Sequence, residues 1–380
     1  MSKIKNIVIA VAVGILFAGM LYYANHDRPT YHSSDTAGIE YEVAKVMRVI
    51  ENRITVDEQM EGIWRGSMTL EVEILTGRYQ GDTAVVENYF SSLYNVRVGK
   101  GDKVSIRIDT TGEGAYQVSI YNYYRVPWLI GCLLVFVLLL IAVGGKKGAK
   151  SVAGLVFTMV CIIWILLPLS LKGYSPLGVT ITLILVCNFV TFFLIDGVCT
   201  KTVVAALGSL GGVLVGAVFS LLAQGIMSVT TYQMDEAETL LLITSTTELE
   251  VKNLFLCGVL IACMGAVMDV AMSIASAIAE LHQVNPSLGA RELFASGMNI
   301  GRDAMGTMSN TLILAFAGSS LNMMLMIYSY GVSFQQLMNT NFVAIEVVQA
   351  IAGSVGIICT VPLVAAVAAN VFSRTKTKKN

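Results

Sequence analysis

The chain has 380 residues and a net charge of −1, and 55% of its residues are hydrophobic while only 13% are charged. A soluble domain usually carries roughly 25% charged residues, so long stretches of this chain have no polar face to offer water. With no basic block before its last residues, the sequence gives no reason to expect a nucleic-acid partner.

The first apolar stretch covers residues 7–24 and predicts an N-terminal membrane anchor helix over residues 1–24. A membrane-spanning helix needs roughly 20 apolar residues, which this run approaches. A cleaved signal peptide is the alternative, because the start is basic and Ala18-Gly19 supplies small residues. The length of the apolar run and the lack of an A-x-A motif before His26 favour a retained helix.

Residues 25–125 differ in kind, because charges are dense and apolar residues alternate with polar ones, as in half-buried strands. The alternation runs through residues 68–74, 104–108 and 116–120, and residues 99–102 are typical of a hairpin turn. About five or six short strands predict a small β-barrel or sandwich domain. None of the 7 cysteines lies in it, so we expect no disulfide there and interpret all of them as small buried hydrophobic residues.

Seven further apolar stretches predict a seven-helix transmembrane bundle over residues 126–373. They cover residues 126–143, 151–171, 176–195, 203–222, 254–277, 307–328 and 342–372, and a basic tail occupies residues 374–380. The predicted fold class is therefore an α-helical polytopic membrane protein with about eight transmembrane helices. The small β domain is inserted between the first and the second of them.

Lysine and arginine are distributed unevenly among the short loops. They precede the first predicted span and follow the second, fourth, sixth and eighth, whereas the opposite loops hold only Lys172 and Lys252. Cytoplasmic loops carry the excess of Lys and Arg, so we expect both termini in the cytoplasm and the β domain on the outer side.

The sixth predicted span contains an acidic residue deep within apolar sequence. Asp269 is followed by Ser273, Ser276 and Glu280 at positions that share one helical face. Ionisable groups inside a membrane are costly and therefore often functional. The alternative is an aspartate that only hydrogen-bonds a neighbouring helix.

A second polar face follows in the sequence, formed by Asn299, Asp303, Gly306 and Asn310. Arg302 lies beside it and is expected to pair with a carboxylate of the preceding span if the two spans pack together. The two faces would then form a polar seam that gates a proton or ion. In the alternative interpretation, this arginine and its neighbouring aspartate only mark the cytoplasmic interface.

Three further residues are secondary candidates. Glu346 and Gln349 share a face of the last predicted span, and Asp196 ends the fourth. In the fifth span, Gly208 and Gly212 belong to a four-residue repeat of small residues that runs to Ser220, and this repeat predicts close helix packing.

Catalytic patterns are absent from the sequence, which has only 3 histidines and no H-E-x-x-H, G-x-S-x-G or Walker A motif. We therefore expect no enzyme, no cofactor, no metal site and no catalytic residue. The run at residues 144–148 is better interpreted as a basic loop than as a phosphate-binding loop.

Two stretches resemble one family of bacterial membrane proteins. The first is residues 265–281, with Asp269, Ser273, Ser276 and Glu280, and the second is residues 301–318, which contains Gly301-Arg302-Asp303, Gly306-Thr307 and Ser309-Asn310-Thr311. Both are similar to the signature of the YibE/F family of multipass membrane proteins, and the likeness extends over most of the chain. This resemblance implies location in a bacterial plasma membrane and no specific activity. The order of anchor, outer domain and bundle is also similar, by analogy only, to SecF-type export proteins.

These observations support two hypotheses. The first is a transporter-like or export-assisting protein that uses ion or proton coupling through the polar seam. The alternative is a non-catalytic membrane scaffold or sensor whose outer β domain binds a partner. Expected partners are the lipid bilayer, an unidentified substrate or protein, and further copies of the chain in an oligomer.

Overall fold

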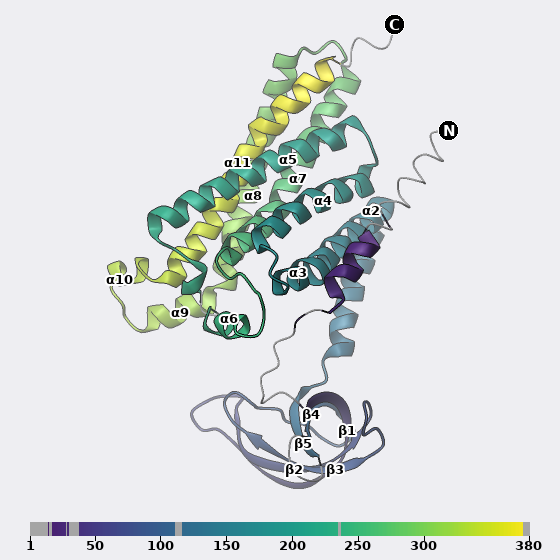
Figure 1. The fold of residues 1–380 in the computed structure, drawn as a ribbon, viewed down its shortest axis with the longest axis vertical. Helices are drawn as coiled ribbons and strands as arrows, with labels where there is room; N and C mark the ends of the chain where they lie inside the picture. The colour runs from purple at the N-terminus through teal and green to yellow at the C-terminus, as the bar shows by residue number, and fades with distance from the viewer. Residues whose placement is uncertain are drawn as a thin grey trace. The chain divides into compact units, whose positions relative to one another are not determined.

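The computed structural model describes residues 14, 17–27, 29, 38–110, 116–234 and 237–374 (Figure 1). The chain divides into two compact units, one of residues 32–139 and the other of residues 1–31 with 140–380. Most of the predicted anchor before residue 17 and the basic tail after Arg374 lie outside the described residues.

The first unit contains a single five-stranded antiparallel sheet with strand order β3-β2-β1-β4-β5. Its strands are β1 (Ile39–Val56), β2 (Trp64–Ile74), β3 (Thr83–Phe90), β4 (Lys103–Asp109) and β5 (Gln117–Tyr123). The edge strands β3 and β5 come into contact, so the sheet curls into a half barrel. The prediction of a β-rich unit is confirmed, and the sandwich alternative is wrong because the described residues of this unit form one sheet.

Alternation along the strands builds the core of this sheet. In β2, Met68, Leu70, Val72 and Ile74 are buried, and in β4 alternate residues are buried in the same way. Two register shifts interrupt the pairing of β1 with β2. Such bulges increase the local twist of a strand, which allows the long β1 to bend around the core.

The predicted turn at residues 99–102 forms, but it does not join two strands of the sheet. The amide of Gly99 donates to Asp102 Oδ2 at 2.8 Å, and Gly101 has a φ of +96°. The preceding Val96 and Val98 are buried without belonging to a strand. The hairpin interpretation is therefore wrong, because apolar alternation records burial and not strand pairing.

We expect Gly66→Ala to destabilise this unit by about 2–4 kcal/mol. Gly66 has a φ of +109°, and an added Cβ would overlap the carbonyl oxygen of Arg53 on the neighbouring strand. Gly81→Ala is the control, because its φ is also positive, at +95°, but a Cβ there would meet open space. Denaturant unfolding of a fragment of residues 38–123 measures both changes, and equal losses of stability would contradict the proposed overlap.

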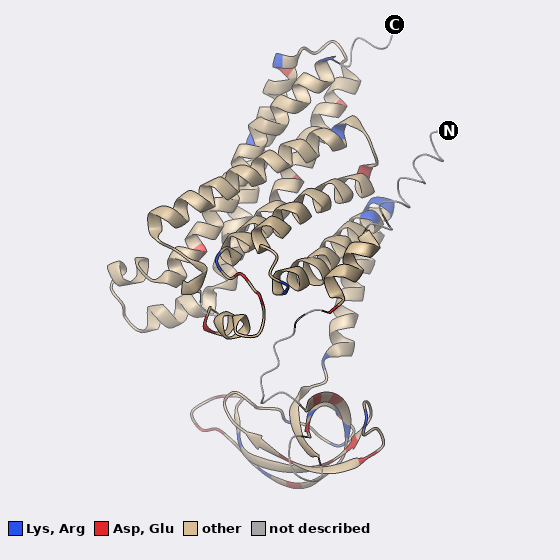
Figure 2. Ribbon diagram, in the orientation of Figure 1, with Lys and Arg blue, Asp and Glu red and all other residues tan. Residues whose placement is uncertain are grey.

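The helices of the chain are long and apolar, and their charges lie mainly at helix ends and in loops (Figure 2). They are α2 (Val126–Cys161), α3 (Leu167–Leu171), α4 (Pro176–Asp196), α5 (Thr200–Met227), α6 (Ala237–Thr244), α7 (Leu254–Val284), α8 (Ala290–Ser319), α9 (Leu321–Ser329), α10 (Phe334–Met338) and α11 (Asn341–Arg374). Among the described residues, five helical runs are long and apolar enough to cross a membrane, and α8 with α9 makes a sixth, bent by 58°. The helices are consistent with a membrane protein, whereas the predicted number of eight spans is not confirmed.

Two predicted spans, 126–143 and 151–171, fall within one helical run of 46 residues. This run breaks at Gly145, which has a φ of +55° and a ψ of −134°. A Cβ added to Gly148 would overlap the carbonyl oxygen of Leu140, so the chain turns sharply at the break. The break lies where the sequence predicts the loop between the two spans.

The predicted span 307–328 has the wrong bounds. Helix α8 begins at Ala290, where the Glu292 carboxylate accepts the amide of Gly289 at 2.8 Å, and it ends before Ser320. Residues 290–306 are too polar to register as an apolar stretch, although they form the first half of a long helix.

The glycine repeat of α5 packs against α11, as the sequence predicts. A Cβ at Gly208 would lie 3.0 Å from Val364 Cα, and one at Gly212 would lie 2.9 Å from the Gly356 carbonyl oxygen. Gly208, Gly212, Gly216 and Ser220 are all buried. Small residues thus allow the two backbones to approach closely.

The N-terminal helix, described from residue 17 to residue 25, is tied to the helical unit by Asn25. Its side-chain amide donates to the Trp164 carbonyl at 2.9 Å. Pro168 has no amide hydrogen, so it cannot donate the usual helical hydrogen bond to the Trp164 carbonyl, which lies four residues before it. Asn25 therefore satisfies a backbone group that the proline leaves free.

Candidate functional site

The polar face predicted on α7 is open. Asp269, Ser273 and Glu280 are exposed and Ser276 is half-buried, whereas Ile274 on the other side of the helix is fully buried. Ser273 Oγ donates to the Asp269 carbonyl at 2.8 Å, so its hydroxyl is satisfied by its own helix. The carboxylates remain available to a partner, water or an ion.

Helix α8 packs through glycines. Gly297 and Gly301 are buried in the groove between α7 and α11. A Cβ at Gly297 would lie 2.6 Å from Ile278 Cδ1, and one at Gly301 would lie 3.0 Å from Ile274 Cδ1. The opposite face of α8 is exposed and carries Asn299, Arg302, Asp303, Gly306 and Asn310.

The predicted polar seam between these two helices does not form. Glycine and isoleucine fill the contact, and each helix turns its polar face away from it. Arg302 Nη1 donates to Asn299 Oδ1 of its own helix at 3.4 Å, and among the described residues it makes no ion pair with Asp269 or Glu280. Tight apolar packing without buried charges is the cheaper way to join two helices, since burying a charge without a good partner costs several kcal/mol.

Contacts on both sides of α11 show how far Arg302 lies from the ends of the helices. Its neighbour Gly301 abuts Val361, and one turn further along α11 Val364 abuts Gly208 of α5. Because α5 begins at Thr200, Gly208 lies roughly 12 Å from the start of α5 at 1.5 Å per residue. Gly301 and its neighbour Arg302 lie about one helical turn further from that end. This height favours a position between the ends of the packed helices over one at their ends.

Four charged groups on these faces have no ion-pair partner within the described part of the chain: Asp269, Glu280, Arg302 and Asp303. Ser273, Thr307 and Thr311 donate their hydroxyls to carbonyls of their own helices, as when Thr307 Oγ1 donates to the Ala304 carbonyl at 2.9 Å. The faces thus carry charges of both signs without ion-pair partners in the described residues, which suits proton or ion handling.

The secondary candidates lie apart from these faces. Asp196 pairs with Lys201 at 3.0 Å across the turn between α4 and α5, which is a structural role. Gln349 and Glu346 are half-buried on α11, and Glu346 Oε2 is buried without a hydrogen-bond partner among the described residues. The sequence did not indicate that this oxygen is unpaired.

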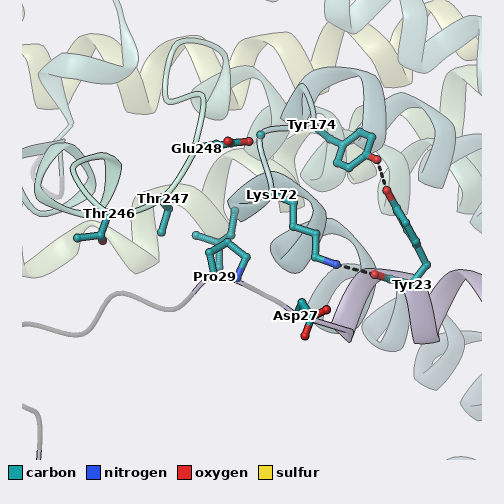
Figure 3. A pocket seen from close by; sticks show the side chains of 10 residues that line it. Tyr23, Asp27, Pro29, Lys172, Tyr174, Thr246, Thr247 and Glu248 are labelled. Carbon is teal, nitrogen blue, oxygen red and sulfur yellow. Dashed lines mark hydrogen bonds between the residues drawn. The ribbon is translucent and has the colours of Figure 1, made fainter.

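One cavity of the helical unit was not predicted. It has a volume of about 550 Å³ and is shown in Figure 3. Three segments far apart in the sequence line it, with Tyr23, Asp27 and Pro29 from the first, residues 171–174 from the second and residues 246–248 from the third. The only sequence signal was Lys172, a basic residue in a loop predicted to face the outer side.

Hydrogen bonds at this cavity hold the N-terminal helix in place. Lys172 Nζ donates to the Tyr23 carbonyl at 2.6 Å and to that of His26, and the ammonium lies 5.1 Å from the centre of the Tyr23 ring. The hydroxyls of Tyr23 and Tyr174 bond to each other (Figure 3), which raises the pKa of Tyr174 above its usual value. Asp27 and Glu248 add carboxylates to a mixed-charge lining.

Comparison with known families supports the resemblance seen in the sequence. The model of the YibE/F-like protein family matches residues 132–374, and the model of the YibE/F family N-terminal domain matches residues 38–123. No curated protein and no solved structure matches the chain significantly. The two family matches cover the half barrel and nearly all of the described helices, and the chain therefore belongs to the YibE/F-like protein family.

Proposed function

We propose that this protein is a transporter-like or export-assisting protein of the bacterial plasma membrane that is driven by ion or proton movement. The observation that carries the proposal is the pair of exposed polar faces on α7 and α8, where Asp269, Arg302 and Asp303 lie without ion-pair partners in the described residues. The one-sided loop charges support cytoplasmic termini and an outer β domain.

Contact of this face with lipid would be expensive. Insertion scales assign roughly 2.5–3.5 kcal/mol to each arginine or aspartate at the centre of a spanning helix. A passive anchor gains nothing from such residues, so the face must meet water or a polar protein surface. A polar path for ions provides both the water and the polar protein surface.

We further propose that a second copy of the chain covers this face and closes the path. Arg302 and Asp303 are neighbours of opposite charge, so each copy can pair its arginine with the other copy's aspartate. Gly306 lies on the same face, and a Cβ there would meet open space. Small residues at such positions allow two helices to approach closely.

Gly306→Cys tests the arrangement, because we expect it to form a disulfide between two copies in the membrane. Val218→Cys is the control, since Val218 is an exposed apolar residue of α5. Non-reducing electrophoresis after mild oxidation measures the dimer. A dimer of the control alone, or of neither variant, would contradict the proposed interface.

A polar path also requires water at the α8 face, which thiol labelling detects. Asn310→Cys should react with a small membrane-impermeant thiol reagent, whereas Val218→Cys should not. Labelling is compared with the unsubstituted protein, whose own cysteines set the background. An unreactive cysteine at position 310 would count against a water-filled path.

The scaffold or sensor alternative is favoured by one feature of the half barrel. A cleft of about 400 Å³ in this unit is lined by Tyr41, Tyr89, Tyr94 and Tyr121. Exposed tyrosines combine apolar area with hydrogen-bonding hydroxyls, a combination common at binding surfaces. A sensor would depend on this cleft and tolerate Asp269→Asn, whereas a transporter would show the opposite dependence.

A further inference from the structure

A second cavity lies at the break between α8 and α9. The chain bends by 58° around Ser320, and beside the bend is a cavity of about 160 Å³ with an almost entirely apolar lining. Ile313, Phe316, Met324 and Phe342 contribute to that lining. An open cleft of about 520 Å³ adjoins it and shares Ser320, Phe342 and Glu346 with it, so ligands have a way in.

Two polar groups of this cavity have no partner in the described residues. Ser320 is only 7% exposed, and its Oγ makes no hydrogen bond. Glu346 Oε2 is buried and also has no partner. A buried carboxylate oxygen without a partner is costly, and a bound cation that donates hydrogen bonds would remove that cost.

We propose that this cavity binds a small organic ammonium compound with an apolar body. The ammonium group donates to Glu346 Oε2 and Ser320 Oγ, while the body fills the apolar part of the cavity. Phe316 and Phe342 line the cavity, and aromatic rings attract cations, while Met324 adapts to irregular shapes. Helix breaks of this kind position ligands in many transporters.

Other cations fit the cavity less well. A divalent metal ion needs about six oxygen ligands, and the enclosed cavity offers the side-chain oxygens of Ser320 and Glu346 alone among its described lining residues. The amine of a lipid headgroup brings a phosphate with it, and neither lining contains a lysine or arginine to bind one. We therefore infer that the ligand is a free organic cation. This binding does not depend on the proposed ion path.

Titration of the purified full-length protein with benzylammonium tests the inference by calorimetry. We expect saturable binding to the wild type, and binding of neutral benzyl alcohol that is weaker by roughly tenfold or more. Glu346→Gln should weaken benzylammonium binding by roughly tenfold or more, and Ser320→Ala by about three- to tenfold. Glu238→Gln removes an equal charge from an exposed position on α6 and should leave the affinity unchanged.

Several results would overturn the inference. These are absence of saturable binding to the wild type, equal affinity for benzyl alcohol, or unchanged affinity in both cavity variants. Because Glu346→Gln removes a charge from a helix, the monodispersity of this variant is checked first. If the Glu346→Gln variant misfolds, Ser320→Ala gives an independent answer. Repeating the titration in bilayer discs with and without phosphatidylethanolamine separates the two sources of amine, since competition by that lipid would contradict the commitment to a free cation.

Discussion

Replacing Gly212 by leucine is expected to abolish the packed helical unit. A Cβ at this position would overlap Thr360 Oγ1 and lie 2.9 Å from the Gly356 carbonyl oxygen, so no side chain larger than hydrogen fits. Backbone atoms of α11 cannot move away without separating it from α5. Overpacking in a well-packed core costs about 1–3 kcal/mol, and a clash with backbone at a helix crossing should exceed that range.

A matched control exists on the same helix. Gly225 also lies in α5, but a Cβ there would meet no atom within 4 Å, so Gly225→Leu should leave stability nearly unchanged. Thermal unfolding and size-exclusion profiles in mild detergent measure both variants. Wild-type behaviour of Gly212→Leu would show that this part of α5 does not face α11.

Several features of the fold are predictable from the sequence because they are local. Alternation in β2 follows from the period of a strand and correctly identifies Leu70 and Val72 as core residues. The four-residue repeat that includes Gly208 and Gly216 identifies the side of α5 that packs closely. In both cases the pattern lies within a single strand or helix, so it can be recognised without knowledge of tertiary contacts.

The direction of a polar face is harder to predict. Helical spacing shows that Asp269 and Ser273 share a face, but it does not show which neighbour that face meets. The contacts of Gly297 and Gly301 decide the packing, and those glycines appeared in the sequence only as part of a polar stretch. The predicted seam failed for this reason, although the polar faces themselves exist.

Local sequence patterns do not predict cavities whose lining residues come from distant segments of the chain. The cavity of Figure 3 needs Tyr23, Lys172 and Glu248 to come together, and nothing in their spacing indicates that they do. The helix break at Ser320 was hidden within an apolar run that could be taken as a single span. In both places tertiary packing creates the site.

Asp269→Asn is expected to remove ion coupling without unfolding the protein. Asparagine keeps the shape of aspartate and one acceptor oxygen, but it replaces the other oxygen with an NH2 donor and does not titrate. Asp269 is exposed on the face of α7 and has no ion-pair partner in the described residues, so its replacement should change stability by less than about 0.5 kcal/mol. A group that takes up and releases a proton on a path contributes typically a hundredfold or more to transfer, so even partial participation implies a loss of roughly tenfold.

Glu238→Gln is the control for this change as well, because it removes a carboxylate from an exposed position on α6, away from the faces of α7 and α8. Equal incorporation of all proteins into vesicles is verified by their yield after flotation. A transport defect in Asp269→Asn alone can then be assigned to the lost titration and not to lost charge in general.

The most direct measurement is proton uptake by vesicles that contain the purified protein, driven by a membrane potential and followed with an internal pH-sensitive dye. The account predicts uptake above that of empty vesicles for the wild type and for Glu238→Gln, and a decrease of roughly tenfold or more for Asp269→Asn. Wild-type vesicles no more permeable than empty ones, or an asparagine variant as active as the wild type, would contradict it.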